Sequence, residues 1–489
     1  MGGANGVTAP PLVNNFHARY SLMNFGKKVV ERTYTLDKAG RIAGTVLSIV
    51  HPLGLWHMIK AKTSILLPIV SILALATGVF LGAISETLSD VVNRTVSTFV
   101  DGYGFFAPVL IFMVLAPVLS RIFSTKQRGK FGLYVVGWLA VTKIVALLWA
   151  TLFTFAVFGL PLFPEHSSSI GGAFATTSKT LLSTLSQSPL FMAIYAAIIT
   201  GVIALKIKGL ANLLEKGVAG IEHIGQYLQP LIPVFMLAVG VYIQSLPTHL
   251  VDQIGLEGTE TSFQTLNILG LQMNPNTTTG MVTAYVVGAL LVAIACFVFH
   301  FGILALAKYK VKRFSIINYF KHYWVKAYPL LWSTSSESLA TPLNLYILKK
   351  NAPYVRPTVR RLVVGVGSAL CTNGTLICVV ILIGLVGGIM GLRFSVVELL
   401  LCIPVAFLIS FGIPGVPGEL LLFAGPVSLI LHIPPEMLPM FLALYLGLQL
   451  GLPDSFRTGA NTTNNYVYCI MLNEVYEKRF LAEKPRGEE

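Results

Sequence analysis

The sequence predicts an all-α polytopic membrane protein with eight transmembrane helices, two re-entrant helical hairpins and inverted repeats. This prediction rests on three observations: the composition, the length of the apolar runs and the distribution of the basic residues. Hydrophobic residues make up 54% of the 489 residues and charged residues only 11%, whereas a soluble domain carries about 25% charged residues. The mean hydropathy of +0.74 agrees with a chain that lies in a lipid bilayer.

Apolar runs of membrane-spanning length recur along the chain, since about 20 helical residues cross the hydrocarbon layer. We expect spans near 63–85, 104–123, 131–160, 188–205, 230–245, 280–304, 362–390 and 435–472. Two further apolar segments, near 323–351 and 394–434, are interrupted by Ser, Pro and Gly. These interruptions predict hairpins that enter the membrane and turn back.

The basic residues gather on one side of this predicted topology. The net charge is +14, and 30 of the 35 Lys and Arg residues fall on the cytoplasmic side if the N-terminus is cytoplasmic. The asymmetry follows the positive-inside rule. It therefore places both termini in the cytoplasm and explains the basic balance without a nucleic-acid partner. The first 62 residues are too polar for a cleaved signal peptide and predict a cytoplasmic arm.

The second half contains one arrangement twice, a broken apolar hairpin followed by a span with polar residues. The first copy has "STSSES" at 333–338 and "CTNGT" at 371–375, and the second has "GIPGVPGE" at 412–419 and "DSFRTGANTTNN" at 454–465. The predicted topology makes the two hairpins enter from opposite sides. Oppositely oriented repeats that meet near the midplane are typical of a transporter binding site.

Polar residues of the last span share one helical face. Asp454, Arg457, Thr458, Asn461 and Asn465 are spaced i, i+3, i+4, i+7 and i+11, so one cavity could receive them all. A guanidinium fork matches a carboxylate, and an aspartate one turn away matches an ammonium. The stripe therefore suits a small zwitterion with an extra acid group. The alternative is an internal ion pair between Asp454 and Arg457 that holds helices together.

The other three motifs predict broken helices. "STSSES" supplies hydroxyls and free backbone N–H groups, which favour an anion. "CTNGT" fits an unwound turn that exposes carbonyls, or a packing kink. "GIPGVPGE" has two prolines and three glycines in eight residues, which predicts a flexible gate tip.

These four motifs, in this order and spacing, resemble the glutamate-transporter family of dicarboxylate and amino acid symporters. The resemblance covers about 280–480 in detail and is topological before that, and "SSES" is similar to bacterial members in particular. It implies a homotrimer in a bacterial inner membrane. Each protomer would hold a transport domain that moves across the membrane like an elevator.

The polarity pattern and the resemblance together divide the chain into five segments. We expect a cytoplasmic arm at 1–62, a mainly scaffold and trimerisation region at 63–245 whose third span joins the transport domain, an external connection at 246–278, a transport domain core at 279–475, and a cytoplasmic tail at 476–489.

The resemblance also implies residue roles. Arg457 matches the arginine that binds the side-chain carboxylate of the substrate, Asp454 matches the aspartate that binds its α-amino group, and the hairpin tips contribute too. With Thr458 of the stripe, the expected substrate-binding residues are Ser335, Ser336, Thr375, Val416, Asp454, Arg457, Thr458 and Asn461. Having both Arg457 and Asp454 favours an acidic amino acid, and the substrate would then neutralise the buried arginine.

The sequence departs from that family at two cation-site positions. The seventh-span motif usually reads N-M-D-G-T, whereas here Asn373 stands in place of its aspartate, and Asn465 replaces an aspartate of the eighth span. An amide supplies a dipole but no charge, which weakens binding of a hard cation such as Na⁺. The positions therefore predict degenerate cation sites, and Glu337 and Glu419 become candidate proton carriers. For Glu337 the alternative is helix capping, and for Glu419 exposure to external water.

The sequence thus predicts a secondary transporter for acidic amino acids such as glutamate and aspartate, with membrane lipid around it. Coupling to H⁺ or exchange is expected in place of sodium coupling. The alternatives are a C4-dicarboxylate symporter, a passive pore, or a receptor that binds without carrying. We expect no enzymatic activity, no catalytic residues, no cofactor and no metal centre, since the five cysteines have neither metal-site spacing nor a disulfide framework.

Overall fold

The computed structural model describes residues 66–95, 128–164, 189–204, 232–253, 263–334, 337–411 and 419–481, with isolated positions between them. Helices make up 83% of this structure, which confirms the predicted helical membrane fold in its coarse form. The arm at 1–62, most of the span at 104–123 and most of the tail at 476–489 lie outside the described residues.

The helices of the first half of the chain are α4 (Leu66–Ile84), α6 (Arg128–Phe158), α8 (Pro189–Ala204) and α10 (Ile232–Gln253). The second half contains α11 (Thr278–Lys310), α12 (Ile316–Tyr319), α13 (Val325–Thr334), α14 (Glu337–Asn351), α15 (Pro357–Leu370), α16 (Asn373–Ile389), α17 (Val396–Ile409), α18 (Leu421–Ile430), α19 (Leu438–Gln449) and α20 (Leu452–Val475). Short π-helical segments at Phe320–Trp324 and Tyr476–Leu481 continue α12 and α20. Pro435–Met437 forms a single 3₁₀ turn before α19.

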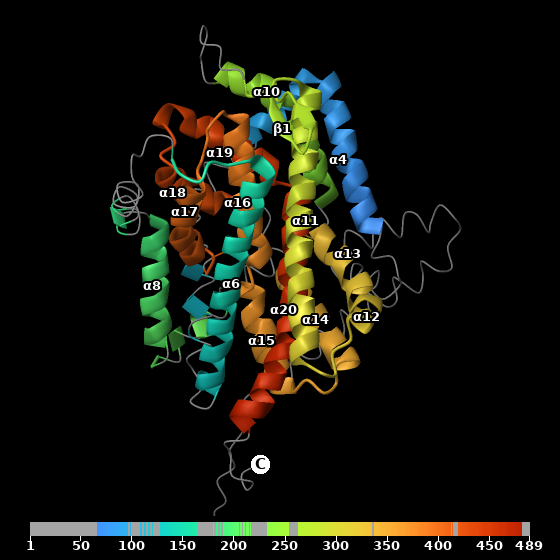
Figure 1. Ribbon diagram of the computed structural model, residues 1–489, viewed down its shortest axis with the longest axis vertical. Helices are drawn as coiled ribbons and strands as arrows, with labels where there is room; N and C mark the ends of the chain where they lie inside the picture. Colours follow the sequence, from blue (N-terminus) through green and yellow to red (C-terminus); the bar gives the residue numbers. More distant parts are fainter. Residues whose placement is uncertain are drawn as a thin grey trace, which may run out of the picture.

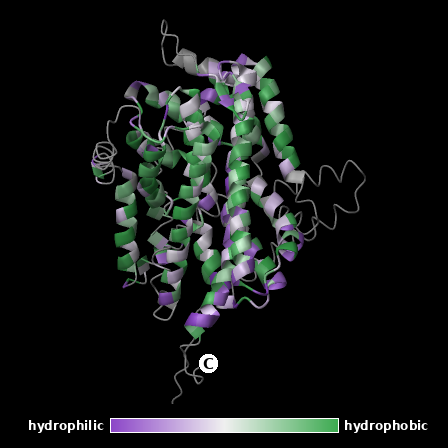
Figure 2. Ribbon diagram, viewed as in Figure 1, coloured by the Kyte–Doolittle hydropathy of each residue, from purple (hydrophilic) through white to green (hydrophobic). Residues whose placement is uncertain are grey.

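Three helices among the described residues are long and apolar enough to cross a membrane: Lys130–Phe158, Thr278–Lys310 and Pro357–Ile389. The bent pair Pro68–Ile84 and Glu86–Thr95, with 119° between its helices, adds a fourth if it counts as one span. Hydrophobic residues cover most of the length of α4, α6, α8 and α11, while hydrophilic residues gather toward the helix ends (Figure 2). The total of eight spans remains a prediction.

The segment predicted to be an external connection contains the one departure from helix among the described elements. Strands β1 (Leu266–Ile268) and β2 (Leu271–Met273) form a two-stranded antiparallel hairpin, with Leu266 opposite Met273. Leu269 and Gly270 form the turn with φ values of 52° and 86°, and two successive positive φ values are what a two-residue hairpin turn requires. This short strand pair is a local exception to the predicted all-α architecture.

The last predicted span, near 435–472, contains a break in the helix. Helix α19 ends at Gln449, and α20 begins at Leu452 after Gly451, whose φ is +78°. The Tyr285 hydroxyl of α11 donates to the Leu450 carbonyl and accepts from the Leu452 N–H, at 2.8 Å in both bonds. The break is thus stabilised by one side chain that satisfies both exposed backbone groups.

A second break separates α15 from α16, where "CTNGT" predicted an unwound turn. Cys371 has φ −85° and ψ 77°, outside the helical region, and α16 resumes at Asn373. Helix α20 lies at the centre of the second half and packs against α11, α13, α14, α15 and α16 (Figure 1). Both breaks therefore lie within protein and not against lipid, as non-helical backbone at membrane depth requires.

Helices α4 and α10 approach each other so closely that glycine is required at the contact. A Cβ atom at Gly240 would lie 2.2 Å from the Leu75 carbonyl oxygen and 3.0 Å from the Gly78 Cα atom. Small residues at such contacts let the backbones of membrane helices pack directly.

We therefore expect Gly240→Ala to lower the thermal unfolding midpoint of the purified protein, because the two helices must separate to admit the methyl group. Overpacking of this kind costs about 1–3 kcal/mol. Gly137→Ala on α6 is the matched control, since no atom lies within 4 Å of a Cβ there. Equal midpoints for both variants and the unmodified protein would contradict the close packing of α4 on α10.

Candidate functional site

The guanidinium of Arg457 lies in the interior of the protein, with no solvent exposure. Its Nε donates to Asp454 Oδ1 at 2.6 Å, and Nη2 forms an ion pair with the same oxygen. Its Nη1 donates to the Thr375 hydroxyl at 3.1 Å, across the break that begins α16. The internal Asp454–Arg457 pair, which the sequence analysis held as an alternative, is therefore present within α20.

Two further carboxylates converge on the same nitrogen of Arg457. Glu419, just before α18, accepts a short hydrogen bond from Nη1, and Glu337, in the first turn of α14, has its Oε1 4.0 Å from Nη1. Thr375 also donates to Glu419 Oε1 at 3.3 Å. We call Asp454, Arg457, Thr375, Glu337 and Glu419 the arginine cluster. It brings together residues from both hairpins and from both broken spans.

This geometry bears on two expectations. Protein carboxylates surround the buried arginine in this structure, and neutralisation of the arginine by a substrate stays a prediction. The alternative that Glu419 faces external water does not hold here, because Glu419 has no solvent exposure and accepts a hydrogen bond from Arg457 Nη1 of α20.

Asn461 is the second polar residue that joins the segments of the site. Its Oδ1 accepts from the Gly374 N–H at 2.6 Å, and its Nδ2 donates to Glu337 Oε1 at 2.6 Å and to the Thr375 hydroxyl at 2.8 Å. A Cβ atom at Gly374 would lie 2.4 Å from the Arg457 carbonyl oxygen. The first turn of α16 thus reaches α20 only because residue 374 is glycine. The Gly374 N–H group, which has no partner within the helix, is then satisfied by Asn461.

Five Asp, Glu, Lys and Arg side chains are buried among the residues that the structure describes: Lys143, Glu337, Glu419, Asp454 and Arg457. Four of them form the charged part of the arginine cluster. When all five buried side chains are ionised, Lys143 included, the two cations and three carboxylates have a net charge of −1. Carboxylates this close to one another do not all ionise readily in an interior, and a single proton would balance the set.

Three other predicted residues, Thr458, Asn373 and Asn465, form hydrogen bonds with groups other than the side chains of this cluster. The Thr458 hydroxyl donates to the Asp454 carbonyl within α20, at 2.9 Å. Asn373 donates to the Tyr468 hydroxyl at 2.6 Å, and Asn465 donates to the Val364 carbonyl at 3.2 Å. Ser335, Ser336 and Val416 lie outside the described residues.

Sequence reasoning overlooked three residues near these segments. Lys143 is fully buried on α6, and the rule that intramembrane charges are functional would have identified it. Gln449, the last residue of α19, is buried with neither its Oε1 nor its Nε2 hydrogen-bonded. Tyr285 supports the break before α20. The sequence contains no signal for the role of Tyr285, since tyrosine is common in membrane helices.

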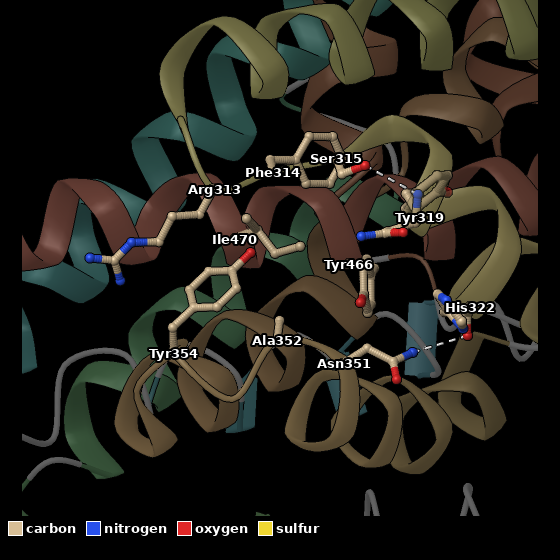
Figure 3. Close-up of a pocket in the computed structure, with 11 residues that line it drawn as sticks. Arg313, Phe314, Ser315, Tyr319, His322, Asn351, Ala352, Tyr354, Tyr466 and Ile470 are labelled. Atoms are coloured by element: carbon tan, nitrogen blue, oxygen red, sulfur yellow. Dashed lines mark hydrogen bonds between the residues drawn. The ribbon is translucent and has the colours of Figure 1, made fainter.

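A separate pocket of about 210 Å³ lies between the connection of α11 to α12, the end of α14 and the second half of α20. Arg313, Asn351, Tyr354 and Tyr466 are among its lining residues (Figure 3), and none of the predicted substrate residues lines it. Polar contacts lead inward from its wall. The Tyr319 hydroxyl contacts His300 Nε2 at 2.8 Å, and His300 Nδ1 contacts Asn464 Oδ1 at 2.7 Å.

Apolar helices of spanning length, with helix breaks around a buried charged cluster, define an integral membrane protein of the transport class. The comparisons with known proteins give the family. A profile of the sodium:dicarboxylate symporter family matches residues 67–475, so the chain belongs to that family. The resemblance seen in the sequence is therefore confirmed. This is a family of transporters and not of enzymes, and its members carry small anionic substrates. No curated protein matched the chain.

Proposed function

We propose that the protein is a secondary active transporter of acidic amino acids such as glutamate and aspartate, driven by protons or working as an exchanger. The observation that supports this proposal is the arginine cluster. It offers a buried guanidinium, held in a fixed orientation by Asp454, to an anionic group. Only a carboxylate or a similar planar anion makes full use of that fork. A homotrimer with elevator motion in a bacterial inner membrane belongs to the same proposal.

Substrate binding requires an exchange of carboxylates at Arg457. Glu419 occupies Nη1 in this structure, so the carboxylate of an incoming substrate takes that position and Glu419 withdraws. The withdrawn side chain then lies in the interior without its cation, where the ionised form is costly. Uptake of one proton by Glu419, or by Glu337 beside it, removes that cost. Substrate and proton would thus enter together.

The residues present do not fit a sodium site at the two predicted positions. Asn373 and Asn465 are both buried, and each directs its NH₂ group at an oxygen atom. Their Oδ1 atoms have no hydrogen-bond partner, but an amide oxygen brings no charge to offset dehydration of the ion. The proposed mechanism therefore assigns no step to sodium.

A C4-dicarboxylate is the second candidate substrate. Asp454 Oδ1 is already bonded to both Nε and Nη2 of Arg457, which reduces its capacity to hold the ammonium group of an amino acid. Succinate needs no such partner. An acidic amino acid therefore requires Asp454 as the partner of its ammonium group, whereas a C4-dicarboxylate does not.

Uptake into proteoliposomes tests the function. Radiolabelled glutamate, aspartate and succinate are offered with sodium and pH gradients imposed separately. We expect accumulation of the acidic amino acids, unchanged when choline replaces sodium and increased by an acid-outside gradient. Steep sodium dependence would contradict the proposal. Equilibration without accumulation or counterflow under every gradient would indicate a passive pore.

Arg457→Lys should keep the charge of the cluster but lose the fork. We expect the affinity for acidic substrates to fall at least about tenfold, since a single ammonium cannot replace both the contacts of Nε and Nη2 with Asp454 and the contact of Nη1 with the substrate. Binding is measured on purified protein alongside the thermal unfolding midpoint. Arg361→Lys, at an exposed position of α15, is the control. Unchanged substrate affinity in a folded Arg457→Lys protein would show that Arg457 does not contact the substrate.

Glu419→Gln should separate two roles of Glu419, competition with the substrate for Arg457 and coupling of transport to protons. A neutral amide competes less well for Nη1, so we expect tighter binding of acidic substrates than in the unmodified protein. The amide cannot exchange a proton, so stimulation by an acid-outside gradient should disappear while substrate exchange continues. Glu436→Gln, at an exposed position, is the control. Undiminished pH stimulation together with unchanged affinity would exclude Glu419 from both roles.

A further inference from the structure

Lys143 is a buried cation that the proposed function does not use. It lies near the middle of α6 and has no solvent exposure, so its side chain cannot extend to an aqueous interface. Its Nζ donates to the Ser410 carbonyl at 2.9 Å and lies 3.8 Å from the centroid of the Phe411 ring. An ammonium group at this depth is costly unless it has a specific task.

The ammonium of Lys143 lies where the end of α17 meets the break between α15 and α16. Ser410 is the C-cap of α17, so its carbonyl belongs to the negative end of that helix. The Thr372 hydroxyl, in the break between α15 and α16, donates to the same carbonyl at 3.4 Å. Carbonyl groups at the ends of broken membrane helices are the groups that coordinate monovalent cations in transporters. Here a lysine from a third helix supplies the positive charge.

The same hairpin connects this contact to the arginine cluster. Ser410 and Glu419 are nine positions apart in the chain, before and after the tip of the second hairpin. One end is held by the ammonium of Lys143 and the other by the guanidinium of Arg457. Two cations from different helices therefore contact the described residues on the two sides of this predicted hairpin.

We propose that the ammonium of Lys143 is a built-in monovalent cation that stabilises the closed second hairpin, in the place of a diffusible cation. The proposal rests on the proposed function in one respect, that the hairpin ending at Glu419 takes part in substrate binding at Arg457. It explains how a member of a sodium symporter family closes its site without two of the expected carboxylates. Removal of the lysine, together with its volume, should create a requirement for an external cation.

Lys143→Ala and Lys143→Met test this on the purified full-length protein. Alanine removes the charge and leaves room for a small ion, whereas methionine removes the charge but keeps most of the side-chain volume. Thermal unfolding and substrate affinity are measured in choline chloride, sodium chloride and methylammonium chloride at one ionic strength. Lys130→Ala, at an exposed position of α6, is the control.

We expect Lys143→Ala to unfold at a lower temperature in choline, and to be restabilised by sodium or methylammonium with at least a tenfold gain in substrate affinity. Lys143→Met should be destabilised in all three salts, and the unmodified protein and Lys130→Ala should respond to none. A folded Lys143→Ala protein that is indifferent to all three salts would overturn the proposal. So would an unmodified protein that sodium stabilises as strongly as it does the alanine variant.

The thermal measurement keeps the two proposals apart. Cation-dependent stability of Lys143→Ala, with no transport of any acidic substrate by the unmodified protein, would refute the proposed function and leave the role of Lys143 intact. Sodium-independent transport by the unmodified protein, together with a Lys143→Ala variant whose stability does not respond to cations, would support the proposed function and refute the role of Lys143.

Discussion

The arrangement of the second half depends on one buried guanidinium. Arg457 has no access to water, so its charge has to be balanced by protein groups, and those groups come from α20, α14 and the segment before α18. Continuous helices could not deliver them. The break before α16 brings the Thr375 hydroxyl and the Gly374 N–H to α20, and glycine at 374 permits the approach. The break before α16 thus supplies partners to the cluster from a second helix and lies within protein, where non-helical backbone is tolerated.

The sequence was sufficient to predict the polar residues that the site contains, but not how they are paired. Arg457, Asp454, Asn461 and Thr375 interrupt apolar segments, and burial in lipid makes such residues conspicuous. Periodicity then places α20 residues on one face, but it says nothing about which side chains from other segments reach that face. Glu419 lies 38 residues from Arg457, and Lys143 lies 267 residues from Ser410. Such contacts depend on tertiary packing, and so does the break at Gly451, which an apolar run conceals.

The carboxylates around Arg457 limit the net free energy with which a ligand can bind there. A substrate that only replaces Glu419 at Nη1 exchanges one ion pair for another, so its net affinity comes from the difference between two similar interactions. That difference depends on what becomes of Glu419 after it withdraws. A proton on the withdrawn carboxylate favours the loaded state, and an acidic medium therefore strengthens binding. In this scheme coupling requires no separate ion site, because the competitor of the substrate is also the carrier of the proton.

The same contacts bear on whether the empty protein can return across the membrane. A carrier whose unloaded site stays open and charged cannot move through the membrane and is restricted to exchange. In the proposed scheme Glu419 takes the position of the substrate carboxylate at Arg457 in the empty carrier, and Lys143 contacts Ser410 on the other side of the same predicted hairpin. One proton on the cluster would then balance the buried charges of the empty carrier, with Lys143 counted among them. An empty carrier balanced in this way favours net proton-coupled uptake over obligate exchange, since its buried charge is then the same as that of the carrier loaded with substrate and a further proton.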